Sequence, residues 1–377
     1  AVTVSAALAE TTYLAVDESK GVKLELDGTA VTGAPVTRTD LTAADGSDLP
    51  DRIDVKFTVA TPFASASTHS LKLTYTTKTA QEVVETVAFT APSYETIPAA
   101  ISTALGTGAD AGIRWKTHQL EAARPGGDNI AEVERQLAGT LGASVHDTTG
   151  QTAAGYFEVP YVNFEQTPTD AGNFNASATD ATLAVGDELI PGIPGTTGGT
   201  DFIAAEALAY VEIPTTGVYQ MVVNSDDGFQ VSAGVSTNTT YKVLGKFDAG
   251  RGAADTAFFF RAEQPGIYLF RLLYFEGGGG ASVEWFTVNG DGSRALVNGT
   301  QTGALKSFKR RTVAEPGIPT TGGGVTKVGL QGGQVRIEYT GTLKSADVVT
   351  GPYTAVTGAA SPYSVSASGA AKFYIAE

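Results

Sequence analysis

The stretch that decides the fold spans residues 216–229, Thr216-Gly-Val-Tyr-Gln-Met-Val-Val-Asn-Ser-Asp-Asp-Gly-Phe229. Its apolar and β-branched residues predict a strand over 217–224, because such residues favour extended backbone. Ser, Asp and Gly favour turns, so Ser225-Asp-Asp-Gly228 predicts a tight hairpin turn. A second strand is predicted over 228–233. The stretch therefore places two adjacent aspartates at a turn between two strands.

A related pattern follows further along the chain. Gly266-Ile-Tyr268 begins another strand-like run, which ends at Glu276 and four glycines, and Val283-Glu-Trp285 comes next. Short strands separated by Gly, Pro and Asp are typical of an antiparallel sandwich. The further strands predicted around this pattern are 156–162, 207–213, 257–261 and 281–288.

In order, spacing and residue type, these elements resemble the signature of the PA14 domain. That family is a β-sandwich module of bacterial toxins, glycosidases and yeast adhesins. The resemblance covers roughly residues 113–300, and a helix predicted near 129–138 is extra to the family's pattern. It also implies a setting, namely a secreted, multi-module surface protein of a bacterium.

The resemblance implies a metal site at the paired aspartates. In lectin-like members of the family, two adjacent aspartates joined by a cis peptide bond bind Ca²⁺, and the ion binds sugar hydroxyls. Asp226 and Asp227 are the matching pair in this sequence. Carboxylate oxygens are ligands that Ca²⁺ prefers. The alternative stays open that the pair only stabilises a tight turn, since many members keep the pair without binding sugar.

Four other residues are candidates for metal or ligand binding. Asn289 and Asp291 alternate along Val288-Asn-Gly-Asp-Gly-Ser293 as in half of a Ca²⁺ loop, although no acidic residue closes the loop. A turn between two strands is the preferred interpretation. Trp285 and Tyr274 are candidates for contact with a sugar, but the alternation along their strands also fits core packing.

The sequence favours a protein that is not an enzyme. It has no cysteine and only three histidines, so thiol catalysis and zinc thiolate sites are excluded. Glu276 and Glu284 are the residues that a glycosidase pair would need, but Glu284 is expected to face solvent. No nucleophile-elbow motif is present. The three histidines are therefore expected to be surface or packing residues.

Charge and composition narrow the partners and the location. There are 40 acidic and 25 basic residues, which give a formal net charge of −15. Nucleic acids and anionic membranes need an electropositive face, so neither is an expected partner. No run of 18 apolar residues is present, so membrane insertion is not expected. A cysteine-free chain rich in Thr, Ser, Ala and Gly suits an exported bacterial protein, extracellular or on the cell surface.

The predicted fold class is all-β, with four regions along the chain. They are an immunoglobulin-like sandwich over 1–99, a PA14-like domain over 100–314, a Pro/Gly linker over 315–324, and a small β module over 325–377. The helix near 129–138 is expected to begin at Asp128, which can accept hydrogen bonds from free N–H groups of the first turn. Ile130, Val133 and Leu137 form its apolar side.

Two functions stay open at this stage. The first is an extracellular structural protein, a self-assembling subunit of a bacterial surface fibre or layer that binds other copies head to tail. Ala1–Ala9 is uncharged and is either donated to a neighbour's sheet or is the first strand of its own sandwich. The second is a Ca²⁺-dependent carbohydrate-binding adhesin with cell-surface glycans as partners, for which Asp226 and Asp227 are the evidence.

Overall fold

The structure is a computed structural model of the 377-residue chain. It describes residues 2–9, 16–32, 36–42, 48–59, 62–97, 104–166, 169, 171–234, 242–312, 324–331, 334–347, 353–366 and 372–376. Over 2–9, 36–42 and 48–58, and at positions 18, 324, 326, 327, 331 and 340, only the backbone is described. The chain divides into two compact units, Ala1–Thr312 and Val313–Glu377. Within the described ranges, no helix has the length and apolar character needed to cross a membrane.

The N-terminal part of the first unit contains two antiparallel sheets. One has the order β1 (Val2–Ala9), β5 (Asp48–Val59), β4 (Val36–Thr42). The other has the order β3 (Thr29–Val31), β2 (Val22–Leu26), β6 (Thr68–Thr76), β7 (Glu82–Thr90), and a 3-10 turn, η1 (Glu18–Lys20), precedes it. β1 pairs with β5 from Val2 opposite Val59 to Ala9 opposite Arg52. The N-terminal segment is therefore a strand of its own sheet.

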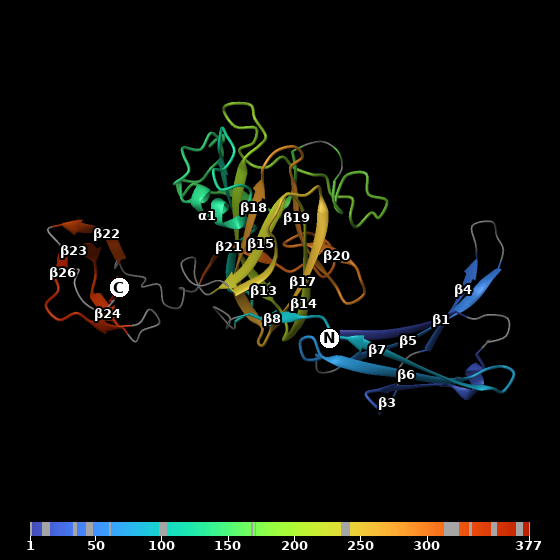
Figure 1. The fold of residues 1–377 in the computed structure, drawn as a ribbon. Coiled ribbons are helices and arrows are strands. Elements are labelled where there is room, and N and C mark those ends of the chain that lie inside the picture. Colours follow the sequence, from blue (N-terminus) through green and yellow to red (C-terminus); the bar gives the residue numbers. More distant parts are fainter. Residues whose placement is uncertain are drawn as a thin grey trace. The chain divides into compact units, whose positions relative to one another are not determined.

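The centre of the first unit is a sandwich of two sheets (Figure 1). The first sheet has the order β11 (Phe157–Val159), β10 (Ile113–Gln119), β13 (Ile203–Ile213), β18 (Gly266–Glu276), β15 (Gly228–Gly234), β16 (Lys242–Phe247). β21 (Ser307–Arg311) pairs with β13 and with β9 (Gly108–Ala111). The second sheet has the order β12 (Asn163–Glu165), β19 (Ser282–Val288), β14 (Gly217–Asp226), β17 (Ala254–Ala262), β8 (Tyr94–Thr96), and β20 (Arg294–Leu296) pairs with β19.

One pairing differs from the predicted division of the chain. β8 lies within the region expected to form the immunoglobulin-like module, yet it pairs in parallel with β17. Ile97, which follows β8, belongs to the core of the sandwich. Residues 94–97 are thus part of the central sandwich.

Aromatic side chains from both sheets fill the core of the sandwich. Trp285 of β19 and Tyr268 of β18 are 0% and 1% exposed, as the sequence predicts. Phe270 of β18 lies between Trp285 and Phe260 of β17, with ring centroids 6.2 Å and 5.5 Å away. Because these rings come from opposite sheets, they hold the two layers together. The all-β class with one short helix is confirmed among the described residues.

The helix α1 (Ile130–Leu137) covers the outer face of the first sheet (Figure 1). Its Ile130, Val133 and Leu137 pack against a separate apolar cluster, made of Ala204, Leu273 and Phe275. The N-cap is Asn129, whose side chain accepts the N–H of Glu132 at 3.1 Å, so the predicted cap at Asp128 is wrong by one residue. Asp128 instead accepts a hydrogen bond from Arg124.

The second unit contains two small antiparallel sheets. Their orders are β22 (Gly324–Gln331), β23 (Gln334–Thr340), β26 (Tyr363–Ser366) and β25 (Thr354–Ala355), β24 (Leu343–Ala346), β27 (Phe373–Ala376). Ile337, Tyr339 and Leu343 form its core. The predicted linker lies outside the described residues except for Gly324, which begins β22.

Both tryptophans, Trp115 and Trp285, are fully buried in the central sandwich, so their fluorescence reports its unfolding selectively. Phe270→Ala removes a ring that contacts both sheets and is expected to destabilise the sandwich by about 3–5 kcal/mol. Urea titration followed by tryptophan emission measures this. Val87→Ala, at a side chain 60% exposed in β7, is the control and should leave the midpoint unchanged. Equal midpoints for the two variants would contradict this packing.

Candidate metal centre

The paired aspartates lie where the chain passes from one sheet of the sandwich to the other. Asp226 ends β14 in the second sheet, and Gly228 begins β15 in the first. β14 pairs with β17 and β19, and β15 pairs with β16 and β18. The two strands therefore do not form the tight hairpin that the turn signal predicted. The peptide bond between Asp226 and Asp227 is cis.

Backbone groups hold Asp227 from both sides. Its carboxylate accepts the N–H of Arg251 at 2.8 Å on one oxygen and the N–H of Gly277 at 2.9 Å on the other. Its own N–H donates to the carbonyl oxygen of Phe275 at 3.2 Å. The hydroxyl of Tyr274 donates to the carbonyl oxygen of Asp226 at 2.6 Å. The end of β18 thus fixes the position of both aspartates.

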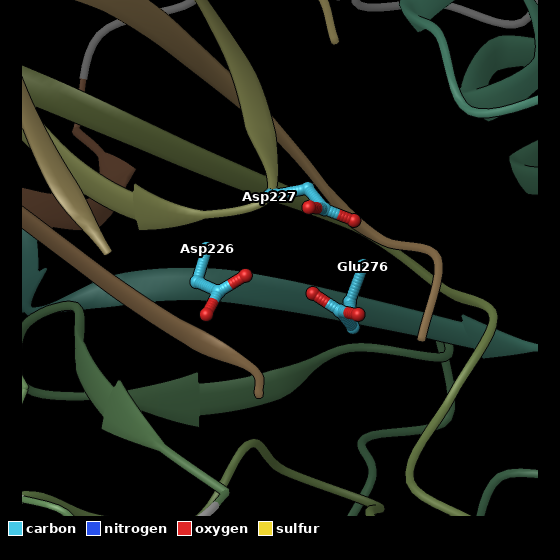
Figure 2. A group of neighbouring side chains, drawn as sticks. All are labelled: Asp226, Asp227 and Glu276. Carbon is cyan, nitrogen blue, oxygen red and sulfur yellow. The ribbon is translucent and has the colours of Figure 1, made fainter. Parts of the chain in front are cut away.

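A third carboxyl group comes from Glu276, the last residue of β18. The residue is 0% exposed, and neither carboxylate oxygen has a hydrogen-bond partner of normal geometry. Asp226, Asp227 and Glu276 each offer an oxygen, and the three oxygens lie within 4.8 Å of one another. Figure 2 shows the three carboxyl groups facing one another. Among the residues that the structure describes, no other such acidic group occurs.

Burial and mutual repulsion oppose the ionisation of this group. Desolvation, followed by the charges of Asp227 and Asp226, raises the pKa of Glu276 to about 8, although the nearby N–H of Gly278 offsets part of the shift. Desolvation and then the charge of Asp227 raise the pKa of Asp226 to about 6, while Arg251 lowers it. A buried carboxylate without a partner is costly. A bound cation would remove that cost, so the residues present fit a divalent metal ion.

The four glycines after Glu276 have no side chains, so their backbone lies close to the carboxylates of Asp226 and Asp128. A Cβ at Gly280 would lie 2.9 Å from Oδ2 of Asp226, and a Cβ at Gly277 would lie 2.3 Å from Oδ2 of Asp128. Any larger residue at Gly277 would displace Asp128. Gly278 and Gly279 are exposed, so the middle of this loop lies at the surface, beside the carboxylate of Asp201.

The structure does not bring Asn289 and Asp291 to this site. Val288 pairs with Gln220, six residues before Asp226 on β14, which places the turn after Val288 about 20 Å from the aspartates. Asp291 accepts hydrogen bonds from the N–H and the hydroxyl of Ser293, as in an ordinary turn. The strand register therefore contradicts the expectation that Asn289 and Asp291 bind the same metal ion as Asp226 and Asp227.

The two aromatic candidates are packing residues. Trp285 and Tyr274 are both 0% exposed and belong to the core between the sheets, so neither ring presents a face to a ligand. Tyr274 contributes through its hydroxyl, which holds the carbonyl oxygen of Asp226.

Glu284 does not face solvent, contrary to expectation. It is 1% exposed, and its carboxylate accepts the N–H groups of Asn173 and Phe174 at 2.8 and 2.7 Å. Burial raises its pKa to about 7, although these N–H donors lower it in part. Glu284 therefore anchors the loop after β12.

One group of hydrogen-bonded side chains, formed by Asp27, His69 and Ser67, was not predicted from the sequence. His69 lies 2.7 Å from Asp27 through Nδ1 and 2.6 Å from the hydroxyl oxygen of Ser67 through Nε2, the order of a catalytic triad. The hydroxyl of Ser67 also donates to the carbonyl oxygen of Ala64 at 2.7 Å. A hydroxyl has one proton, so Ser67 accepts from His69 when it donates to Ala64. These hydrogen bonds connect the turn at Asp27 to β6. The expectation that the chain is not an enzyme stays a prediction.

Comparison with known proteins bears on the fold. No protein-family model matches the sequence, and no curated protein matches it. Among solved structures, a PA14 sugar-binding domain from an RTX adhesin is similar at 15% identity and a TM-score of 0.33, over 50% of this chain and 95% of that one. The central sandwich resembles a PA14 domain.

Two further PA14-related structures are similar to the chain. The PA14 domain of the antifreeze protein MpAFP has 14% identity and a TM-score of 0.34, over 54% of this chain and 93% of that one. The epithelial adhesin 9 A domain of Candida glabrata, solved with Galb1-3GlcNAc, has 11% identity and a TM-score of 0.39, over 59% of this chain and 100% of that one. Likeness at this level concerns the fold of the PA14-like domain alone.

The raised pKa of Glu276 predicts how the metal-free domain responds to pH. A group whose pKa is higher in the folded state stabilises the fold while protonated, and this contribution is lost as the pH rises through the folded pKa. Without Ca²⁺, Glu276 is therefore expected to lower the urea midpoint as the pH rises from about 5 to 8.5. Asp226 and Glu284 act in the same direction, whereas the pKa values of His118 and His146, lowered by burial, oppose the fall below about pH 6.5. Saturating Ca²⁺ should restore the urea midpoint at the higher pH.

Glu276→Gln removes one ionisable group and should reduce this pH dependence, while the contributions of Asp226 and Glu284 remain. Asp291→Asn is the control, since Asp291 lies in the distant turn and should keep the parental response. A parental pH dependence in Glu276→Gln would show that the Glu276 carboxyl group is not the source.

Proposed function

We propose that the PA14-like domain is a Ca²⁺-dependent carbohydrate-binding module through which the protein adheres to cell-surface glycans. The observation that supports this most is the buried carboxylate of Glu276, which has no hydrogen bond of normal geometry and faces Asp226 and Asp227. When it is ionised, such a group needs a cation for charge compensation, and without one the raised pKa of Glu276 favours the protonated form. The function also implies an extracellular or cell-surface location.

The donor set favours Ca²⁺ over other metal ions. Ca²⁺ takes six to eight oxygen ligands in a flexible geometry, and zinc prefers nitrogen and sulfur ligands. The three side chains supply only carboxylate oxygens. Three carboxylates leave positions in the coordination sphere for water or for ligand hydroxyls.

The surroundings of the centre favour a neutral, hydroxyl-rich ligand. Asp226 and Asp227 are half-buried beside a loop whose Gly278 and Gly279 are exposed, so a ligand would approach the ion from the side of this loop. Asp201 adds a further carboxylate beside the loop, where it accepts the N–H of Gly279 at 3.3 Å. An acidic sugar would meet repulsion from this carboxylate, whereas vicinal hydroxyls of a neutral sugar can bind the ion directly.

Asp226→Asn is expected to abolish Ca²⁺ binding measured by calorimetry, because it removes a charged ligand from a three-carboxylate centre. The same variant should lose retention on an array of neutral glycans in Ca²⁺. The parent should lose retention when EDTA replaces Ca²⁺. Asp291→Asn is the control and should behave as the parent in all three measurements.

Two outcomes would contradict this function. Ca²⁺ binding that survives Asp226→Asn would place the ion elsewhere. Glycan retention that is equal in Ca²⁺ and EDTA would separate sugar binding from the metal.

A second candidate function, a self-assembling surface subunit, is favoured by β22. This strand lies at the edge of its sheet, and its Val328 and Leu330 are 61% and 72% exposed. Their partners on β23, Ile337 and Val335, belong to or pack against the apolar core of the unit. Such an apolar strand at a sheet edge invites pairing with another copy. The pairing of β1 with β5 argues against simple donation of the N-terminal strand.

Leu330→Lys tests this second candidate, because a charge at an edge strand opposes pairing. Sedimentation velocity over a range of concentrations should show larger species for the parent and fewer for the variant. A parent that stays monomeric at every concentration would contradict self-assembly.

A further inference from the structure

Arg124 is a buried arginine that connects the helical segment to the metal centre. Its side chain is 0% exposed. Its Nε donates to the side chain of Gln136 at 2.6 Å, and Nη1 donates to the carboxylate of Asp128. Nη1 and Nη2 both donate to the carbonyl oxygen of Glu276, at 3.2 and 3.3 Å, and Nη2 also donates to that of Ile203.

These contacts use the whole donor capacity of the guanidinium group. Arginine has five N–H donors in a fixed plane, and the structure gives Arg124 five hydrogen bonds. Two of them fix the main chain of Glu276, and none reaches its carboxylate. Arg124 therefore holds the backbone of Glu276 in place while its carboxylate oxygens stay available to an ion.

The same contacts bring the helix into the site. Gln136 lies on α1, and Asp128 lies just before the N-cap of α1 and against Gly277. Gln136 also donates to the carbonyl oxygens of His118 and Phe202, so it is itself fixed. The segment that is extra to the PA14 pattern thus contacts the glycine loop and, through Arg124, the last residue of β18.

We propose that Arg124 is a positioning residue for the metal centre, and that α1 and its preceding loop hold Arg124 in that role. The proposal rests on the proposed function, because it assumes that Asp226, Asp227 and Glu276 bind Ca²⁺. Arg124 does not touch the ion. It sets the position of the strand end from which Glu276 reaches the two aspartates.

The charge of Arg124 and its hydrogen bonds are expected to affect Ca²⁺ affinity in opposite directions. A fixed positive charge near the centre repels a cation, so loss of the charge alone would strengthen Ca²⁺ binding. Loss of the hydrogen bonds would release the end of β18 and weaken binding. Arg124→Lys keeps the charge and removes the fixed fork of donors, so it isolates the effect of position.

The matched control is Arg271→Lys. Arg271 lies on the same strand as Glu276 and also contacts α1, through Glu134, and β13, through Glu206. Calorimetry with Ca²⁺ alone on the full chain should show binding about tenfold weaker in Arg124→Lys, the scale seen for residues that orient metal ligands. Arg271→Lys should stay within about twofold of the parent, even if both variants lose similar thermal stability.

A double-mutant cycle tests whether the effect passes through Glu276. In a Glu276→Asp background, which keeps the charge but shortens the side chain by one methylene, Arg124→Lys should cause no further loss of Ca²⁺ affinity, because the carboxylate that it positions no longer reaches the ion. Should Arg124→Lys not fold, Gln136→Met replaces it, since that change removes the acceptor of the Nε–H without altering charge. Gln136→Met should weaken binding in the same direction.

Each outcome decides for or against the proposal. Parental or tighter Ca²⁺ binding in Arg124→Lys overturns it, as does equal weakening in Arg271→Lys. Additive losses in the cycle overturn the route through Glu276. A parent chain that binds no Ca²⁺ overturns the proposed function and, with it, this proposal; a parent that binds Ca²⁺ while Arg124→Lys is unchanged overturns this proposal alone.

Discussion

Repulsion among three carboxyl groups is the constraint on which the candidate metal centre of the central sandwich depends. Asp226, Asp227 and Glu276 offer oxygens within 4.8 Å of one another, and Glu276 is fully buried. Left to itself, such a group would separate or take up protons, which is the direction of the raised pKa values of Asp226 and Glu276. Because the surrounding backbone holds the three carboxyl groups together, we propose a cation as the partner of this site.

Several features of the fold act together to hold that arrangement. The hydroxyl of Tyr274 fixes Asp226, and the N–H groups of Arg251 and Gly277 fix Asp227. Arg124 fixes the main chain of Glu276 through its carbonyl oxygen. These residues lie on different strands and loops of both sheets, so the centre depends on the closed sandwich and on the aromatic core between its layers.

The local sequence pattern was sufficient to predict the strands, the all-β class and the burial of Tyr268 and Trp285. It was not enough for Glu276 and Glu284, because the burial of a carboxyl group depends on which loops and strands cover it. The position of Glu276 directly before four glycines was the one local signal. The distance of Asn289 and Asp291 from the site follows from the register of β14 and β19, which no local pattern fixes. The helix cap was missed by one residue because Asp128 accepts a hydrogen bond from Arg124, and the neighbouring Asn129 accepts an N–H of the first turn.

The central claim is that one Ca²⁺ ion is bound by three carboxylates, and a crystal structure grown in CaCl₂ tests it most directly. Diffraction data at a long wavelength locate the ion through its anomalous signal. The account predicts one peak about 2.3–2.6 Å from carboxylate oxygens of Asp226, Asp227 and Glu276 together. No peak at this place, or an ion bound by the aspartates with the Glu276 carboxyl group turned away from it, would contradict the account.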